Sequence, residues 1–463
     1  MRRHLLKHAR VALFASLAGV AAALVGGPAR ADGGIPGSLA ILLPADQPRN
    51  IALATTFGLI LSEDGGASWQ WTCEQFATTS MANLYAVGPP AVASGGIGDR
   101  FYALSPLKGL AISDDGSCTW STSGGALAGL SVSDFFVDPT DPAHVLAAGT
   151  AVADGSAGAP AVFASTDGGA AFLDAPLFTA PFGAAIVGIE IARSNPNVIY
   201  VAYYVASGDR DPVVVRTTDG GAHWSIADLQ KSLGSAIVRI LAVDPVDSDL
   251  VYLRAITASG EAVVALRDLT TVSVPLTLTK GQVSAFARLQ SGTVLVGALV
   301  PFAGDGGGTM GAGFRSTDGG MSFQPWAPPG QPHLVGLAER IENGRPRLYL
   351  SGKNYSDGWA LAVSDDEGAT LTPLMTYDQV KGIKPCVQQA CLDTCNFEET
   401  QAIWPPAVCS GGGATGGGGG GGTGSGSGCH CGLDPTQPGG GGLFGLTGLA
   451  AVLAWKRRAR RRH

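Results

Sequence analysis

The chain has few residues of the kinds that most catalytic sites require. It holds seven histidines in 463 residues, and those of the expected mature body stand at isolated positions: His144, His223, His333 and His430. No Ser/His/Asp or Cys/His arrangement can be argued from them. The sequence also has no P-loop, no dinucleotide-binding glycine motif opening a helix, and no EF-hand pattern. We therefore expect no cofactor and no metal site, and we assign no catalytic residue.

Basic residues are scarce in the body of the chain. Of 30 lysines and arginines, five lie within residues 1–31 and six within the last eight residues, which leaves 19 against 37 acidic residues. The net charge of the body is therefore near −18. Such a surface repels phosphate backbones, so the composition argues against a nucleic-acid partner.

The body also lacks sustained helical periodicity, and a short motif recurs in it instead. Each copy reads Ser or Thr, any residue, Asp, then a glycine-containing turn, and most copies end on Trp or Phe five residues after the aspartate. The aspartates are separated by 51, 52, 52, 99 and 48 residues. The motif positions are Asp64, Asp115, Asp167, Asp219, Asp318 and Asp366. The step of 99 residues equals two ordinary steps. It predicts a further repeat that lacks the motif, called here the silent repeat, with Asp268 in its turn. A fixed period of about 50 residues indicates a propeller or a solenoid.

Each motif follows a short apolar run and is expected to form a hairpin turn. Glycine accepts positive φ without steric cost, and the aspartate can accept hydrogen bonds from backbone N–H groups two residues on. A strand–turn–strand element with Asp and Pro precedes several copies, as at Asp138-Pro139 and Asp244-Pro245. Four strands in about 50 residues suit a propeller blade. The predicted fold is all-β: a single seven-bladed β-propeller of four-stranded blades over residues 35–385.

These repeats resemble the Asp-box (BNR-repeat) β-propeller superfamily, which includes sialidases, xyloglucanases, sortilin-type receptors and photosystem II assembly factors. The resemblance covers the whole body, but it rests on structural residues, so it implies fold more than function. It leads us to expect a non-catalytic binding or scaffold module for a protein or glycan. The alternative that it leaves open is a glycoside hydrolase of sialidase or xyloglucanase type.

The hydrolase alternative has only formal candidates. The first arginine motif of the sialidases is missing here, although Glu190 could be paired with Tyr200, Tyr203 or Tyr204 as an activated nucleophile. A xyloglucanase-like mechanism needs two facing carboxylates, for which Asp138 and Asp244 are the best positions. All of these residues are equally compatible with structural roles in strands and turns.

Both ends of the chain predict export and membrane attachment. Residues 1–31 have a basic start, an apolar stretch and an Ala-x-Ala site, as in a secretory signal peptide. Residues 410–438 form a Gly-rich tether, and residues 439–463 form a short apolar helix with a basic end. This order is similar to the C-terminal sorting tails of myxobacterial surface proteins, which implies that Cys429 or Cys431 is the processing or lipid-attachment residue. A plain membrane anchor is the alternative. We expect the body on the cell surface or outer membrane, or released after processing.

Cysteines in an exported chain are expected to pair. Cys73 and Cys118 stand at comparable positions of neighbouring repeats, which makes a bridge between them plausible. A Cys-rich segment, residues 386–409, is expected to hold two disulfides of open connectivity among Cys386, Cys391, Cys395 and Cys409. Zinc is the alternative there, but the C-x₂-C pairs of common zinc sites are missing. Calcium at Asp244, Asp247 and Asp249 is a further alternative to a solvated turn.

Overall fold

The computed structural model describes a body made almost entirely of β-strands. The described residues are 37–45, 47–73, 84–89, 100–105, 109–153, 156–205, 210–301, 308–405 and 407–409. Within them, the strands form six four-stranded sheets, one five-stranded sheet and two short two-stranded pairs. The larger sheets are numbered here in chain order as sheets 1 to 7.

Four strands of each larger sheet come in order along the chain and pair antiparallel. Sheet 1 contains β1 (Ser38–Leu42), β2 (Ile51–Thr55), β3 (Gly58–Ser62) and β4 (Trp69–Thr72). Sheet 2 contains β5 (Leu84–Val87), β6 (Phe101–Ser105), β7 (Gly109–Ser113) and β8 (Ser121–Thr122). Sheet 3 contains β10 (Ser131–Val137), β11 (Val145–Thr150), β14 (Ala161–Ser165) and β16 (Phe178–Thr179). Sheet 4 contains β17 (Ala184–Ile191), β18 (Ile199–Val205), β19 (Asp211–Thr217) and β20 (Ser225–Asp228).

The remaining sheets repeat the same order. Sheet 5 contains β21 (Ile237–Val243), β22 (Leu250–Thr257), β23 (Gly260–Arg267) and β24 (Thr271–Thr279). Sheet 6 contains β25 (Gln282–Arg288), β26 (Val294–Pro301), β27 (Thr309–Ser316) and β28 (Gln324–Trp326). Sheet 7 is β29 (Gly336–Glu342), β30 (Arg345–Ser351), β31 (Leu361–Ser364), β32 (Thr372–Met375). The short pairs are β12 (Val152–Ala153) with β13 (Ser156–Ala157), and β9 (Gly124–Gly125) with β15 (Ala171–Phe172). Two one-turn helices, α2 (Gln230–Leu233) and α3 (Asn354–Asp357), lie in loops.

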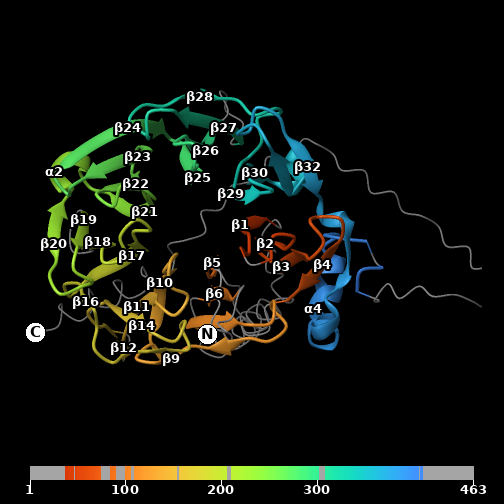
Figure 1. Ribbon diagram of the computed structural model, residues 1–463, viewed down its shortest axis with the longest axis horizontal. Helices are drawn as coiled ribbons and strands as arrows, with labels where there is room; N and C mark the ends of the chain where they lie inside the picture. Colours follow the sequence, from red (N-terminus) through yellow and green to blue (C-terminus); the bar gives the residue numbers. More distant parts are fainter. Residues whose placement is uncertain are drawn as a thin grey trace, which may run out of the picture. The chain divides into compact units, whose positions relative to one another are not determined.

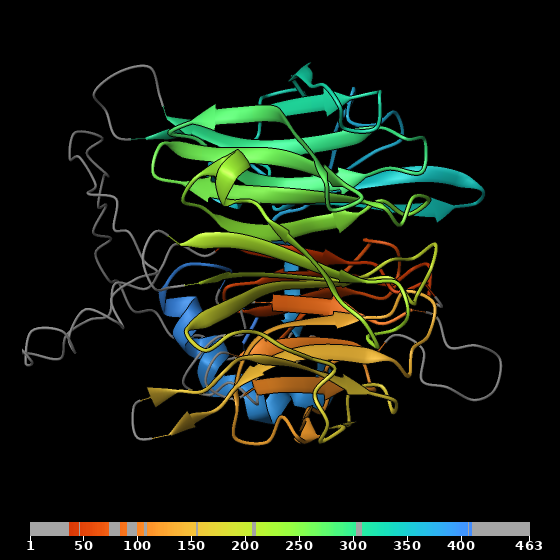
Figure 2. The ribbon, with the colours of Figure 1, turned by 90° about the vertical axis from the view of Figure 1, so that its left-hand side faces the viewer.

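The first strands of successive sheets contact one another, and this series returns to its start. Strand β1 contacts β5, and the contacts continue through β10, β17, β21 and β25 to β29, which contacts β1 again (Figure 1). Apolar side chains fill the spaces between neighbouring sheets, as in the cluster of Tyr200, Val214, Val251 and Val264 between sheets 4 and 5. Figure 2 shows the same stack of sheets from the side. Sheet-on-sheet burial around a closed series is the arrangement expected of a propeller.

The recurring aspartates lie in the turn between the third and fourth strands of their sheets. In sheet 1, the hydroxyl of Ser62 donates to Asp64 at 2.8 Å, and the same oxygen accepts from the N–H of Gly66 at 2.8 Å. Asp64 accepts in turn from the N–H of Ser68 at 2.9 Å. The same bonds recur at Asp115, Asp167, Asp219, Asp318 and Asp366. The accepted N–H is thus four residues after the aspartate, not two as expected, because two glycine-type positive-φ residues widen the turn.

The silent repeat forms its turn in a different way. Asp268 and Leu269 connect β23 to β24, with φ of 52° and 56°. Two consecutive residues of positive φ give a tight hairpin whose twist matches that of the strands. The position of Asp268 therefore agrees with the expected step, although the serine and glycines of the other copies are missing.

Tyrosines on second strands tie two of the motif turns to the preceding sheet. Tyr102 of β6 donates to the carbonyl of Gly168 at 3.0 Å, and Tyr252 of β22 donates to that of Gly319 at 2.7 Å. Both rings are buried. Since each accepting glycine belongs to the motif turn of the next sheet, the repeats support one another as well as folding locally.

We expect Asp167→Ala to lower the free energy of unfolding by about 1.5–3 kcal/mol, because the turn loses charge-assisted hydrogen bonds. In the folded protein Asp167 accepts from Ser165 Oγ at 2.7 Å and from the N–H of Ala171 at 3.0 Å. Denaturant unfolding measures the change, with the exposed Asp174→Ala as control. A loss no larger than that of the control would show that the turn does not need its carboxylate.

The end of the described chain packs against sheet 1. After the 3-10 turn η1 (Tyr377–Gln379), strand β33 (Val380–Ile383) pairs parallel with β4 and becomes the fifth strand of that sheet. The turn η2 (Pro385–Val387) and helix α4 (Gln388–Thr400) follow, and Figure 1 shows α4 beside β4. Trp404 packs against Phe57 and Trp71, with ring centroids 5.6 and 5.1 Å away. The segment thus belongs to the core of sheet 1.

Three disulfides connect this segment. Cys73 is bonded to Cys391, Cys118 to Cys386, and Cys395 to Cys409. The expectation of disulfides is confirmed, but the proposed Cys73–Cys118 bridge is wrong. Of the two bridges expected among the last four cysteines only Cys395–Cys409 forms, whereas Cys386 and Cys391 bond Cys118 and Cys73. The physical reason is the parallel strand β33, which carries Cys386 and Cys391 to the outer edges of sheets 1 and 2, where each meets a different partner.

Several predicted segments lie outside the described residues. They are the signal peptide at 1–31, the Gly-rich tether at 410–438 with Cys429 and Cys431, and the apolar tail at 439–463. The helices of the described part are all too short or too polar to span a bilayer.

Candidate functional site

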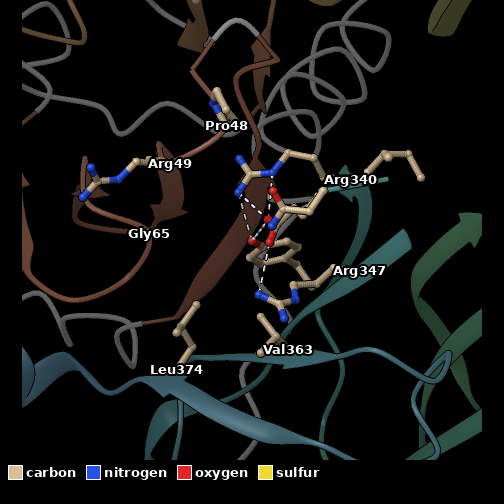
Figure 3. A pocket seen from close by; sticks show the side chains of 11 residues that line it. Pro48, Arg49, Gly65, Arg340, Arg347, Val363 and Leu374 are labelled. Carbon is tan, nitrogen blue, oxygen red and sulfur yellow. Dashed lines mark hydrogen bonds and ion pairs between the residues drawn. The ribbon is translucent and has the colours of Figure 1, made fainter. Parts of the chain in front are cut away.

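A cavity of about 430 Å³ lies where sheet 7 meets sheet 1 (Figure 3). Sheet 1 contributes the turn before β2, with Pro48 and Arg49, and Gly65 of its aspartate turn. The strands β31 and β32 of sheet 7 contribute Val363 and Leu374. A second cavity of about 590 Å³ adjoins the first and includes Asp365. Both are open at the surface rather than enclosed.

The β29–β30 hairpin supplies the charged wall that the two cavities share. Its turn is Asn343-Gly344, with φ of 51° and 76°, which suits a two-residue hairpin. In this hairpin Arg340 pairs with Arg347, and Glu342 with Arg345. Residues opposite each other or two apart lie on one face of a sheet. One face therefore carries four charged side chains: Arg340, Glu342, Arg345 and Arg347.

Glu342 is the centre of a hydrogen-bonded network on this face. Its carboxylate accepts from Arg340 at 3.0 and 2.6 Å, from Arg347 Nη1 at 3.1 Å, and from the hydroxyl of Tyr349. Arg340 also donates to the carbonyl of Asn50 at 2.8 Å, which ties sheet 7 to sheet 1. In Figure 3 the guanidinium groups of Arg340 and Arg347 lie above and below the dashed lines that mark these bonds. The network holds both guanidinium groups in place.

The network shifts the titration of its members. Burial alone would raise the pKa of Glu342, but the hydrogen bonds from Tyr349 and Arg340 and the nearby guanidinium charges hold that pKa below its usual value. Burial and the bond to Glu342 raise the pKa of Tyr349 to about 12. Glu342 is thus an anion and Tyr349 a neutral donor at physiological pH, so the arrangement is a fixed set of charges with no group poised for proton transfer.

Arg347 also forms a two-pronged ion pair with Asp365. Its Nε donates at 2.7 Å and its Nη2 at 3.1 Å, one to each carboxylate oxygen. The hydrogen bond from Arg347 lowers the pKa of Asp365. Asp365 is 70% exposed and Arg347 is 37% exposed, so the pair stands at the opening of the second cavity. A planar guanidinium in this geometry is a receptor for carboxylates.

The formal hydrolase candidates are committed to other contacts. Asp138 is buried and accepts from the N–H of Thr140 at 2.8 Å and from His144 at 3.1 Å. Asp244 is buried and accepts from the N–H of Val246 at 3.0 Å and from Arg288 at 2.8 Å. Asp138 therefore serves as an acceptor within its own turn, and Asp244 accepts both within its turn and from the next sheet.

Glu190 connects two sheets and is not joined to a tyrosine nucleophile by any of the described hydrogen bonds. Its carboxyl group accepts from the N–H of Val243 at 2.7 Å, while Tyr200 donates to the carbonyl of Ser248 at 2.8 Å. Asp134 accepts in a similar way from the N–H of Ile189 at 2.8 Å. Burial raises the pKa of Glu190 to about 8 and that of Asp134 to about 6. Of these two inter-sheet acceptors, Asp134 was not singled out from the sequence, and Glu190 was considered there only as the partner of a tyrosine nucleophile.

The metal alternatives are not supported by the described geometry. Asp247 pairs with Arg267 at 2.6 Å, and Asp249 pairs with Arg216. No group of three or more potential ligands comes together in the part of the chain that the structure describes. The cysteines proposed as zinc ligands are bonded in disulfides.

The charged hairpin was missed in the sequence, although a signal for it exists. Several repeats carry an Asp/Pro turn between their first two strands, as at Asp138-Pro139 and Asp244-Pro245, whereas sheet 7 has Glu342-Asn-Gly-Arg345. An Asn-Gly turn between strands with charges at alternate positions predicts a projecting hairpin with one charged face. Which residues of sheet 1 would meet that face could not be read from the repeat.

Comparison with solved structures agrees with the observed architecture. An ancestral GH74 enzyme, itself a β-propeller protein, matches with a TM-score of 0.50 and 16% identity over 72% of this chain and 46% of that chain. The chain has a β-propeller fold. It spans less than half the length of that enzyme, and likeness at this identity concerns the fold alone.

Other solved propellers match less closely. YCF48 from Cyanidioschyzon merolae has a TM-score of 0.46 and 14% identity, covering 72% of this chain and 97% of that one. An alpha-L-arabinanase of Penicillium chrysogenum complexed with arabinobiose has a TM-score of 0.33 and 12% identity, covering 50% and 77%. No protein-family model matches the chain, and no curated protein does.

Proposed function

We propose that this protein is a non-catalytic binding module, a seven-bladed Asp-box propeller that holds a protein or glycan ligand. The observation that carries the proposal is the charged face of the β29–β30 hairpin beside two open cavities. Its guanidinium groups are fixed by Glu342, as a recognition site requires. The carboxylates suggested for hydrolysis accept structural hydrogen bonds instead.

The module is displayed outside the cytoplasm in this proposal. Residues 1–31 direct export, and the tail at 439–463 holds or sorts the protein at the membrane, with Cys429 or Cys431 as the processing residue. The three disulfides support an oxidising compartment, since such bonds are rare in reducing ones.

A binding array combined with a turnover assay tests the proposed function. The purified protein is applied to arrays of glycans and of extracellular proteins, and bound ligands are then incubated with it and analysed by mass spectrometry. We expect saturable binding with no change in ligand mass. Release of sugar from a bound glycan would contradict the proposal and would favour the glycoside hydrolase alternative.

A further inference from the structure

We propose that Arg347 is the receptor for a carboxylate of an acidic peptide, and that Asp365 occupies this receptor until the peptide arrives. This inference rests on the proposed binding function and specifies its ligand. It follows from the position of Arg347, which lines both cavities and whose guanidinium N–H groups point to the opening.

The two carboxylates that Arg347 contacts differ in their exposure and in the number of hydrogen bonds that hold them. Glu342 is 18% exposed and accepts from Arg340, Arg347 and Tyr349, so it is part of the framework. Asp365 is 70% exposed, and the described structure gives it hydrogen bonds from Arg347 alone. Exposed ion pairs contribute little free energy, because water solvates both partners well when they separate. An incoming carboxylate can therefore replace Asp365 on the fork at small cost.

The neighbouring wall is aliphatic, which suits a peptide better than a sugar. Val363 and Leu374 line the first cavity, and Ile341, 41% exposed, stands at its rim. The one aromatic ring among the described lining residues belongs to Tyr349, and Arg340 lies over it at 5.3 Å. That ring is unavailable as a stacking platform. An acidic residue followed by an aliphatic one matches both parts of the site.

The charge of the site contrasts with that of the body. The lining of the two cavities includes four arginines against two carboxylates, whereas the body as a whole is strongly acidic. The arginines are Arg49, Arg340, Arg345 and Arg347. An acidic peptide is repelled by most of the surface and attracted here, so charge selects the site and orients the approach.

Fluorescence anisotropy with defined probes tests the inference. The probes are a labelled hexapeptide of alternating glutamate and leucine, the same peptide with glutamine, and a labelled oligogalacturonate as a carboxylate-bearing glycan. The protein variants are Arg347→Ala, Arg347→Lys and Asp365→Asn. Arg267→Ala and Asp247→Asn are controls, because they alter an arginine–aspartate ion pair of 2.6 Å in sheet 5 that lies outside the two cavities.

We expect the glutamate peptide to bind and the glutamine peptide to bind much more weakly. Arg347→Ala should weaken binding roughly tenfold or more, since a central arginine is lost. Arg347→Lys, which keeps the charge and loses the fork, should weaken it to an intermediate degree. Asp365→Asn should strengthen binding about two- to fivefold, because the competing carboxylate is removed. The control variants should bind as the wild type does.

Each contrary result has a distinct meaning. Unchanged binding in both Arg347 variants, weaker binding in Asp365→Asn, or equal binding of the glutamine peptide overturns the inference. Binding of oligogalacturonate but not of the peptide shows that the ligand class is wrong, while the proposed binding function stands. If neither probe binds but the arrays reveal a ligand, the assigned site fails and the function remains. Turnover of an array ligand contradicts the function itself.

Discussion

Replacing both cysteines of either long-range disulfide by alanine should lower the free energy of unfolding by about 4 kcal/mol. The bonds Cys73–Cys391 and Cys118–Cys386 join residues 318 and 268 positions apart. While one bond remains, the second bond closes only the short stretches of chain that lie between the two bridges. Removal of either bond alone therefore leaves the unfolded chain closed by the other. Loss of both should cost roughly 8–10 kcal/mol, more than the two single losses combined, because the unfolded chain is then no longer closed between its ends.

Denaturant unfolding of the two paired variants and of the quadruple variant measures this effect. The matched control is Cys395→Ala with Cys409→Ala, which opens a loop of only 14 residues within the C-terminal segment. We expect this control to increase proteolysis near α4 while the β-sheets unfold as in the wild type. If the quadruple variant loses no more than one paired variant does, the two bonds do not act as a nested closure.

The stability of the protein should fall as pH rises through the titration of Glu190. Burial raises the pKa of Glu190 from 4.5 to about 8, so the folded state binds its proton more tightly than the unfolded chain does. The stability that this proton contributes is fully present below pH 4.5 and is lost as pH rises to about 8. Asp134, with a pKa of about 6, adds a similar loss at lower pH, and its negative charge further raises the pKa of Glu190.

Glu190→Gln should remove most of this dependence. Glutamine keeps an oxygen that can accept from the N–H of Val243 and never ionises. At pH 9 we expect the variant to be more stable than the wild type by on the order of 2–4 kcal/mol, and at pH 4 nearly equal. Thermal unfolding across this range measures the difference, with the exposed Asp174→Asn as control. A difference that does not change with pH would show that Glu190 ionises normally in the folded protein.

The recurring turns are the part of the fold that could be predicted from the sequence. A serine, an aspartate two residues later and two glycine-type positions form hydrogen bonds within one turn, as at Ser62, Asp64 and Gly66. Because every partner lies within four residues, local composition is enough to specify the turn. The turn at Asp268 was predicted from the spacing of the repeats instead, and there two residues of positive φ form the turn without the serine and glycine pattern.

The disulfide pairing and the candidate site were decided by tertiary structure. Cys73 follows the last strand of sheet 1 and Cys118 lies in the motif turn of sheet 2. Only the placement of β33 beside β4 shows that each bonds a C-terminal cysteine. The cavity joins Arg49, near the start of the described chain, to Arg347, near its end. Contacts over such separations depend on how the last sheet meets the first.

The repeating sequence by itself determined an all-β chain of similar units and the turn that all but one of these units use. It could not determine the proposed ligand-binding face, because the hairpin at Asn343-Gly344 departs from the repeated pattern, and a repeat predicts nothing about such a departure. That hairpin is held in place when Arg340 of sheet 7 donates a hydrogen bond to the carbonyl of Asn50 in sheet 1. Local hydrogen bonds form wherever their sequence occurs, whereas a site between the first and last sheets exists only after the chain has returned to its start.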